Sequence, residues 1–268
     1  MEIYQGVVLG ILQGLTEFLP VSSSGHLVMG QHFFNMTEPM LAFDISVHLG
    51  TLAAVIIIFY RDIKNMAASI FNRVEKKNDF RLFLLILAGS IPTAVLGLGL
   101  KKIEHLIFSS VLLVGCMLIL TGIVLWLTKR VPNMETDQDQ GRAISNISFK
   151  SAVIIGTCQG VAVIPGISRS GSTIAAGLFA GLDRKTAGRF SFLLSIPAIM
   201  GAELLHLAGS LHDPISINSA TLFGTLAAFI TGYAALLLLL RIVNKGKLHI
   251  FAPYCWLAGS FAIIYHFI

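Results

Sequence analysis

The sequence predicts an all-α polytopic membrane protein with six transmembrane helices and two re-entrant helical hairpins in an inverted repeat. Of its 268 residues, 55% are hydrophobic and only 12% are charged, whereas an ordinary globular domain has about 25% charged residues. Six segments are long and apolar enough to cross a bilayer, and two more are apolar but interrupted by Pro, Gly and Ser. This composition excludes a soluble enzyme, a disordered chain and a fibrous protein.

A helix needs about 20 mainly apolar residues to cross the hydrocarbon core of a bilayer. Each predicted span has about this length. The basic residues lie mostly between the spans, where they can set the orientation of the chain. The six predicted spans cover residues 41–60, 82–100, 107–128, 187–208, 219–240 and 251–268.

Two apolar regions, 2–34 and 150–181, do not have the pattern of simple spans. The sequence FLPVSSSGH interrupts the first, and IPGISRSGS interrupts the second. Irregular backbone at membrane depth is tolerated only where it is buried in protein or lines a wet cavity. We therefore expect each region to form a re-entrant hairpin that enters and leaves on the same face. Two full spans per region are the alternative, although arms of about 16 residues are short for that.

The distribution of Lys and Arg predicts the orientation. If the N-terminus is outside, the segments on the cytoplasmic side hold 16 of the 19 basic residues. Cytoplasmic loops of membrane proteins carry such an excess of positive charge. The sequence therefore predicts a multi-pass protein with both termini outside, in the periplasm. The cytoplasmic segments are 61–81, 129–150, 182–189 and 241–248.

The two interrupted regions are similar to each other. A shift of 146 residues makes seven of the 21 positions from 6 to 26 identical, including both Gln-Gly pairs and both Ser-x-Ser-Gly turns. Each half then has one hairpin and three spans, and the odd number of spans inverts one half relative to the other. Such repeats place their functional site near the midplane, where the interruptions meet. The predicted organisation is a single membrane domain, 1–268, with repeat one at 1–129, a polar cytoplasmic linker at 130–149 and repeat two at 150–268.

The side chains at the two interruptions suit a phosphorylated ligand. Charged groups inside a bilayer are costly and are usually functional or paired. Arg169 can bind phosphate through two parallel hydrogen bonds, and the helix that starts near Ser170 offers backbone N–H groups to an anion. Glu17 and His26 can move protons or hold a divalent cation. The further candidates for phosphate binding are Ser22, Ser24, Ser168, Ser170, Ser172, Thr173, Gln13 and Gln159.

A structural role is the alternative for each candidate. Glu17 could serve only to neutralise Arg169, His26 could be a buried histidine bonded to a carbonyl, and a serine in a turn is often only a helix cap. Asp44 and His48, four residues apart near the outer end of the first span, are further candidates for a site role. The carboxylate of Glu203 lies inside the fourth span, and we interpret it as a packing or pore-facing polar group.

Two segments carry a family resemblance. QGLTEFLPVSSSGH at 13–26 and PGISRSGST at 165–173 resemble the two signature motifs of the bacterial undecaprenyl-pyrophosphate phosphatase family. FDISVHLGTLAAV at 43–55 and FSFLLSIPAIMG at 190–201 are also similar to that family, so the resemblance covers nearly the whole chain. One position differs within the permitted pattern, because Gln13 stands where the family can have a first glutamate. This weakens any metal site built from two carboxylates of that turn.

The resemblance implies a hydrolase of the bacterial inner membrane that acts mainly at the outer face. It would remove the terminal phosphate of undecaprenyl diphosphate and so recycle the lipid carrier for peptidoglycan synthesis, an activity tied to bacitracin resistance. A divalent cation, Mg²⁺ or Ca²⁺, is implied, with Glu17 as a candidate ligand. A homodimer is a family-level expectation, and no nucleic-acid partner is expected. By motif position the catalytic candidates are Glu17, His26 and Arg169, with Ser23, Ser168, Ser170 and Thr173 in support.

The sequence leaves the nucleophile open among His26, Ser23 and a water molecule. It also leaves a rival function, a lipid or ion transporter or flippase that uses the same midplane site. Phosphate release without a gradient would separate the two. The acid-phosphatase-like lipid phosphatases are rejected, because SRSGSTIAAGLFAGLD has no His between its Arg and its Asp. A non-catalytic scaffold does not explain the polar cluster at membrane depth.

Overall fold

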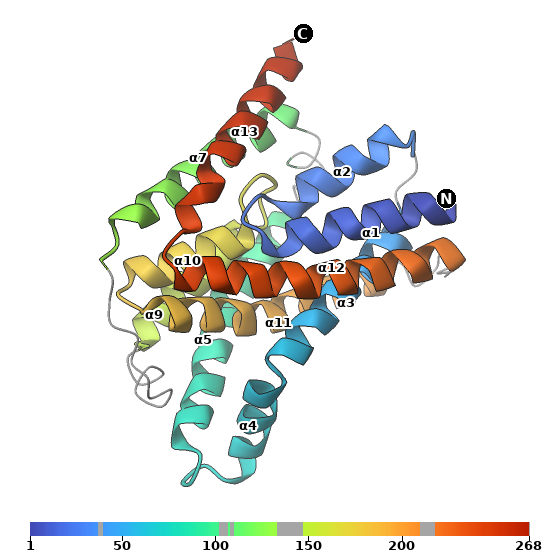
Figure 1. Cartoon of the computed structure of the whole chain (residues 1–268). Helices are drawn as coiled ribbons and strands as arrows, with labels where there is room; N and C mark the ends of the chain where they lie inside the picture. Colours follow the sequence, from blue (N-terminus) through green and yellow to red (C-terminus); the bar gives the residue numbers. More distant parts are fainter. Residues whose placement is uncertain (37–39, 102–106, 108–109, 133–146, 210–217, 268) are drawn as a thin grey trace.

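The computed structural model describes residues 1–36, 40–101, 107, 110–132, 147–209 and 218–267. In these residues the regular structure is entirely helical, as the sequence predicts (Figure 1). The α-helices are α1 (Ile3–Phe18), α2 (Ser23–Phe33), α3 (Leu41–Ile58), α4 (Tyr60–Phe71), α5 (Lys77–Lys101), α7 (Val111–Leu127), α9 (Phe149–Val161), α10 (Arg169–Phe179), α11 (Arg184–Gly209), α12 (Ser219–Asn244) and α13 (Ala252–Phe267). Two short 3₁₀ turns, η1 (Thr128–Arg130) and η2 (Leu248–Phe251), precede the linker and α13.

In the part of the chain that the structure describes, six helical segments are long and apolar enough to cross a membrane, which confirms the predicted number of spans. They contain α3, α5, α7, α11, α12 and α13. Two of them begin earlier than predicted, since α5 starts at Lys77 and α11 at Arg184. The apolar pattern alone could not place these starts, because each first turn is polar and lies beyond the apolar run. The greater part of the predicted linker, residues 133–146, lies outside the described residues.

Helix α4 is an addition to the predicted elements, because residues 61–81 were expected only as a cytoplasmic segment. Its apolar residues recur at helical spacing, and Met66 is buried while Ile63 packs against the core. Such a one-sided apolar face is typical of an amphipathic helix. Asp62 of α4 forms an ion pair with Arg189 of α11. This pair holds α4 against the start of the fourth span.

The first interrupted region folds back on itself. Helix α1 ends at Phe18, α2 begins at Ser23, and the ring of Phe34 after α2 lies 6.1 Å from the ring of Tyr4. The two ends of the region therefore meet, which fits the predicted re-entrant hairpin. The second region has the same order, with a turn that separates α9 from α10.

Small residues let each hairpin pack closely on a span. Gly6, Gly10 and Gly14 of α1 face the backbone of α12 so closely that a Cβ at any of them would clash. Gly156 of α9 meets Gly89 of α5 in the same way. Close approach through small residues is typical of helix pairs in membranes. The three glycines of α1 therefore have a packing role.

The two interruptions touch each other in the centre of the molecule. The backbone N–H of Gly166 donates a hydrogen bond to Ser22 Oγ at 3.1 Å. Thr121 Oγ1 of α7 donates to the Gly166 carbonyl at 3.0 Å, and Cys255 Sγ of α13 lies 3.3 Å from the Pro20 carbonyl oxygen. These contacts fix the turns that carry both predicted motifs.

Candidate active site

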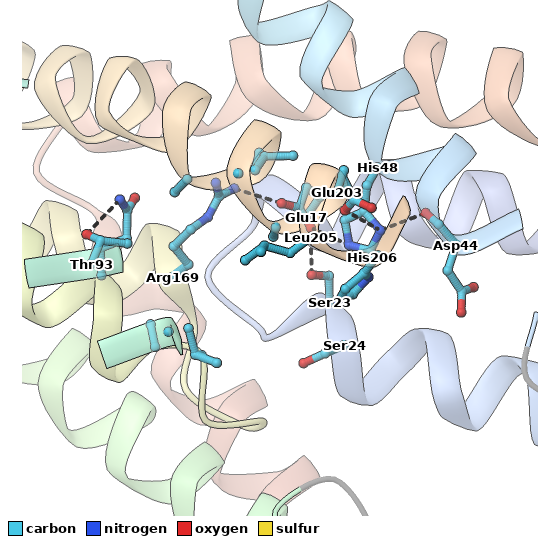
Figure 2. Close-up of a pocket in the computed structure, with 18 of the residues that line it drawn as sticks. Glu17, Ser23, Ser24, Asp44, His48, Thr93, Arg169, Glu203, Leu205 and His206 are labelled. Carbon is cyan, nitrogen blue, oxygen red and sulfur yellow. Dashed lines mark hydrogen bonds and ion pairs between the residues drawn. The ribbon is translucent and has the colours of Figure 1, made fainter. Parts of the chain in front are cut away.

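A cavity of about 880 Å³ lies beside the two interruptions. Its wall combines polar and apolar side chains from seven of the described helices and from the turns before α2 and α10, as Figure 2 shows in part. The cavity can therefore accommodate an amphiphilic ligand. The polar lining includes Glu17, Ser23, Asp44, His48, Arg169 and Glu203, and the apolar lining includes Ala94, Leu98, Val163, Ile167, Leu204 and Leu205.

Glu17 joins three helices at this cavity (Figure 2). Its Oε1 accepts a hydrogen bond from Arg169 Nη2 at 2.7 Å, across 152 positions of sequence. Its Oε2 accepts hydrogen bonds from Ser23 Oγ at 2.7 Å and from Gln13 Nε2 at 3.0 Å. The Glu17 side chain is only 6% exposed. The structure thus pairs Glu17 with Arg169, as the structural alternative expected, and also puts both of them on the cavity wall.

Arg169 is the first residue of α10 and has unused hydrogen-bonding capacity. Its Nη1 is buried and has no hydrogen-bond partner among the described residues. A buried donor without a partner costs free energy, and a guanidinium binds phosphate through several donors at once. The free Nη1 therefore suits an anionic group of a ligand in the cavity.

The other predicted residues of the second interruption either line the cavity or lie away from it. Ser168 lines the cavity and caps α10, where its Oγ accepts a hydrogen bond from Gly171 N at 3.1 Å. Gln159 also lines the cavity, but its Nε2 donates to Thr93 Oγ1 and to the Leu194 carbonyl. The remaining three, Ser170, Ser172 and Thr173, are not among the lining residues.

The serines of the first interruption all line the cavity. Ser22 adopts a φ of +68°, in the left-handed region that non-glycine residues rarely occupy. Strain of this kind costs about 1–3 kcal/mol and persists where the surrounding structure holds it. The hydrogen bond from Gly166 N to Ser22 Oγ supplies that support. The next two residues, Ser23 and Ser24, then project into the cavity from the start of α2.

His26 has a different position from the one that the sequence predicts. Its Nδ1 is 2.8 Å from the Ser22 carbonyl oxygen, and its Nε2 is 2.5 Å from the hydroxyl of Tyr254 on α13. The two rings also stack. His26 is not among the residues that line the cavity. This is the geometry of a histidine bonded to a carbonyl, and a catalytic role for His26 stays a prediction.

Three further ionisable residues of the polar wall, Asp44, His48 and Glu203, come from the spans. His48 Nε2 lies 3.9 Å from Glu17 Oε2, and His48 Nδ1 lies 3.8 Å from Glu203 Oε1. Asp44 Oδ1 accepts a hydrogen bond from Gln31 Nε2 at 2.6 Å. The sequence left Asp44 and His48 open and treated Glu203 as a packing or pore-facing group. A carboxylate inside an apolar span is itself the signal that could have placed Glu203 at the site.

The carboxylates of the cavity do not form a complete metal site by themselves among the described residues. They fit better a cation that is held jointly by the protein and by a phosphorylated substrate. Among the described residues, no three His, Cys, Asp or Glu side chains are arranged to hold a metal ion. The hydrogen bonds to Glu17 occupy both of its oxygens but leave lone pairs. Mg²⁺ is commonly held by one or two carboxylates together with the phosphates of a substrate. The chemistry of this wall is compatible with that arrangement.

Comparison with known proteins identifies the family. The model of the family described as bacitracin resistance protein BacA matches residues 6–261. The chain belongs to this family. A relative from Desulforapulum autotrophicum is 56% identical over the full length of both chains, and one from Desulfosudis oleivorans is 54% identical over 97% of each. A relative from Halothermothrix orenii is 43% identical over 98% of each chain. All three are named undecaprenyl-diphosphatase, so the family that the two motifs predict is confirmed.

Proposed function

We propose that the protein is an integral membrane phosphatase that hydrolyses undecaprenyl diphosphate to undecaprenyl phosphate and inorganic phosphate. The observation that carries the proposal is the half-buried Arg169, whose buried Nη1 has no partner among the described residues and which lies beside the hydrogen-bonded pair Glu17 and Ser23. The names of the relatives support the same reaction. In a cell the product would return to the pool of lipid carrier for peptidoglycan synthesis.

The cavity would bind the two parts of the substrate differently. Arg169 would hold the diphosphate with the guanidinium group that now pairs with Glu17. The N-terminus of α10, capped by Ser168, would add the favourable field of a helix dipole. The apolar wall, which includes Leu98 and Leu204, would accept the first units of the prenyl chain. The rest of the chain would remain in the surrounding lipid.

Ser23 is the nucleophile that the geometry favours. Its Oγ already donates a hydrogen bond to Glu17 Oε2 at 2.7 Å, which is the arrangement of a nucleophile and its base. Ser23 Oγ would attack the terminal phosphorus and pass its proton to Glu17. The bond from that phosphorus to the bridging oxygen breaks, and the lipid phosphate leaves with the electron pair. Water then hydrolyses the phosphoserine and restores the Ser23 hydroxyl.

A divalent cation, Mg²⁺ or Ca²⁺, is part of the proposal. Glu17 and the oxygens of the diphosphate would hold it, because the protein wall alone does not form a complete set of ligands among the described residues. When bound, the cation would neutralise part of the charge of the diphosphate. Arg169 would still orient the phosphate, and Glu17 would still take the proton.

The proposed setting is the bacterial inner membrane, with both termini in the periplasm and the two halves as an inverted repeat. The N-terminus packs beside the start of α12, since Gly6 contacts Ala220. The start of α9 lies at the other end, where Arg81 donates to the Ile147 carbonyl. The two hairpins therefore begin at opposite ends, which fits an inverted repeat. Access from the outer face and the homodimer stay predictions from the family resemblance.

Phosphate release by the purified protein tests the proposal. The protein in detergent, without any gradient, should release inorganic phosphate from a long-chain prenyl diphosphate, and a chelator should lower the rate. A protein that binds the lipid but releases no phosphate would contradict the proposal and favour the transporter.

The role of Ser23 has its own test. Ser23→Ala should remove nearly all turnover, and terminally labelled substrate should leave label on serine in the unsubstituted protein. Ser90→Ala is the matched control, because Ser90 also lines the cavity but its hydroxyl bonds to Ile86 of its own helix. Full turnover in Ser23→Ala would exclude Ser23 as the nucleophile.

A further inference from the structure

The cavity continues from its polar wall into a gap between α5 and α11. The two helices are in contact near their middle, because a Cβ on Gly89 of α5 would lie 3.0 Å from Leu194 Cδ1 of α11. About two helical turns further on, Gly97 and Gly201 line the cavity. Among the described residues, a Cβ on Gly97 would meet only Val163, at 4.0 Å, and a Cβ on Gly201 would meet nothing within 4 Å. The space in front of both glycines is therefore open.

Both helices contain a proline between their contact and the gap. Pro92 follows Gly89 by three residues in α5, and Pro197 follows Leu194 by three residues in α11. Proline inside a helix removes a backbone hydrogen bond and usually bends the helix. Such bends are a physical cause for α5 and α11 to part at this level.

The corresponding position on α12 is closed. Gly224 of α12 meets the backbone of α1 as Gly89 of α5 meets the backbone of α9, and in both spans another glycine follows eight residues later. On α12 this is Gly232, where a Cβ would lie 3.3 Å from the Thr51 side chain of α3. On α5 it is Gly97, which faces no atom of α11 within 4 Å. The gap therefore belongs to one half of the molecule and is not a general result of glycine in a span.

Apolar side chains form the rim of the gap. Leu98 of α5 is 51% exposed and Leu204 of α11 is 62% exposed, and both also line the cavity. Both lie in helical segments that are long and apolar enough to cross a membrane, where exposed leucines contact lipid. The gap thus connects the polar wall around Arg169 with the hydrocarbon of the bilayer.

We propose that this gap is the lateral passage for the prenyl chain, and that the absence of side chains at Gly97 and Gly201 determines whether a long chain fits. The inference rests on the proposed phosphatase function and adds two residues that determine its substrate specificity. A lipid chain is the occupant that the structure favours, because the gap is apolar and continuous with the cavity where Arg169 would hold the diphosphate. The lipid could then react while most of its chain stays in the bilayer.

Larger side chains at the two glycines test the passage. Gly97→Phe and Gly201→Phe should each raise KM for a long-chain prenyl diphosphate by about tenfold or more and change kcat by less than about threefold, because the ring fills the passage and not the polar wall. Gly97→Val and Gly201→Val should raise KM less. Gly99→Phe is the matched control, since Gly99 also has open space around its Cβ but is not among the lining residues. Thermal unfolding in detergent shows which variants fold, and a valine variant replaces any phenylalanine variant that does not.

A photoreactive substrate locates the chain directly. A long-chain prenyl diphosphate with a diazirine on its second isoprene unit should label α5 and α11 of the unsubstituted protein, as mass spectrometry of the peptides would show. Excess unlabelled prenyl diphosphate should remove this label, whereas excess phosphatidylglycerol should not. Gly97→Phe should weaken the labelling, and Gly99→Phe should leave it unchanged.

The outcomes are distinct from those for the proposed function, because labelling needs no turnover. Label on α5 and α11 without phosphate release would contradict the phosphatase and still support the passage. Phosphate release with the label on other helices would overturn the passage alone. A KM within twofold of normal in folded variants of both Gly97 and Gly201 would also overturn it. Loss of the label to excess phosphatidylglycerol would mean that the gap holds bulk lipid, which contradicts the proposal as well.

Discussion

The two terminal nitrogens of the Arg169 guanidinium lie in different environments. Nη2 bonds to Glu17 at 2.7 Å, whereas Nη1 is buried without a partner among the described residues. A phosphate can therefore bind Nη1 first and need not break the ion pair to begin binding. Lys cannot reproduce this division, because its ammonium is one compact charge without a planar fork.

Arg169→Lys should therefore lower turnover by about 100-fold, the loss that follows removal of one donor at a reacting oxyanion. Arg189→Lys is the matched control, because Arg189 also pairs with a carboxylate and has similar exposure, but it binds Asp62 away from the cavity. Steady-state release of inorganic phosphate in detergent measures both variants. Near-normal turnover in Arg169→Lys would exclude phosphate binding through the two arms of the guanidinium.

Some residues of the site could be predicted from the sequence, and others could not. Glu17, Ser23 and Arg169 are predictable, because charge and hydroxyl groups at membrane depth are costly and both motifs surround a turn. The approach of His48 to Glu203 depends on how α3 packs against α11, and no local pattern encodes it. The position of His26 depends on the rotation of α2 about its axis, which the Ser22 carbonyl and Tyr254 stabilise.

At the scale of the helices, glycines determine how close α1 comes to α12. A Cβ on Gly10 would meet the backbone of Gly224, which cannot move aside as a flexible side chain can. The number of spans was predictable because hydropathy and length are local properties. The helix against which each hairpin packs was not predictable. Glycines spaced four residues apart indicate a close helix contact, but they do not identify the partner helix.

Gly10→Ala should lower the thermal stability of the protein in detergent, with a cost of about 1–3 kcal/mol from overpacking. Gly99→Ala is the control, since a Cβ on Gly99 has no neighbour within 4 Å. That change should be neutral or should stabilise α5 by up to about 1 kcal/mol through helix propensity. Thermal unfolding of the two variants side by side measures the difference. Equal stability would mean that α1 and α12 do not pack through this face.

For the whole molecule, the proposed topology puts opposite ends of the spans on opposite sides of the membrane. Asn72 follows α4, in a segment that the basic residues place inside, and Ser219 begins α12 at the end that they place outside. Both residues are exposed.

Single cysteines at these positions test the orientation. In a background without Cys116, Cys158 and Cys255, Ser219→Cys should react with an impermeant thiol reagent in intact cells, and Asn72→Cys should react only after lysis. Labelling of Asn72→Cys in intact cells would reverse the orientation. Labelling of both would contradict the number of spans between them.

The ion pair between Glu17 and Arg169 can form only late in the synthesis of the chain. The two residues are 152 positions apart, so Glu17 enters the membrane about 8–30 s before its partner at ordinary rates of translation. The glycines of α1 wait longer still, because their partner helix begins at Ser219. The first hairpin therefore spends most of the time of translation with an unpaired carboxylate and an uncovered packing face. It reaches its final position only when the nascent chain is nearly complete, so a chain that stops before α12 leaves that hairpin exposed to membrane quality control.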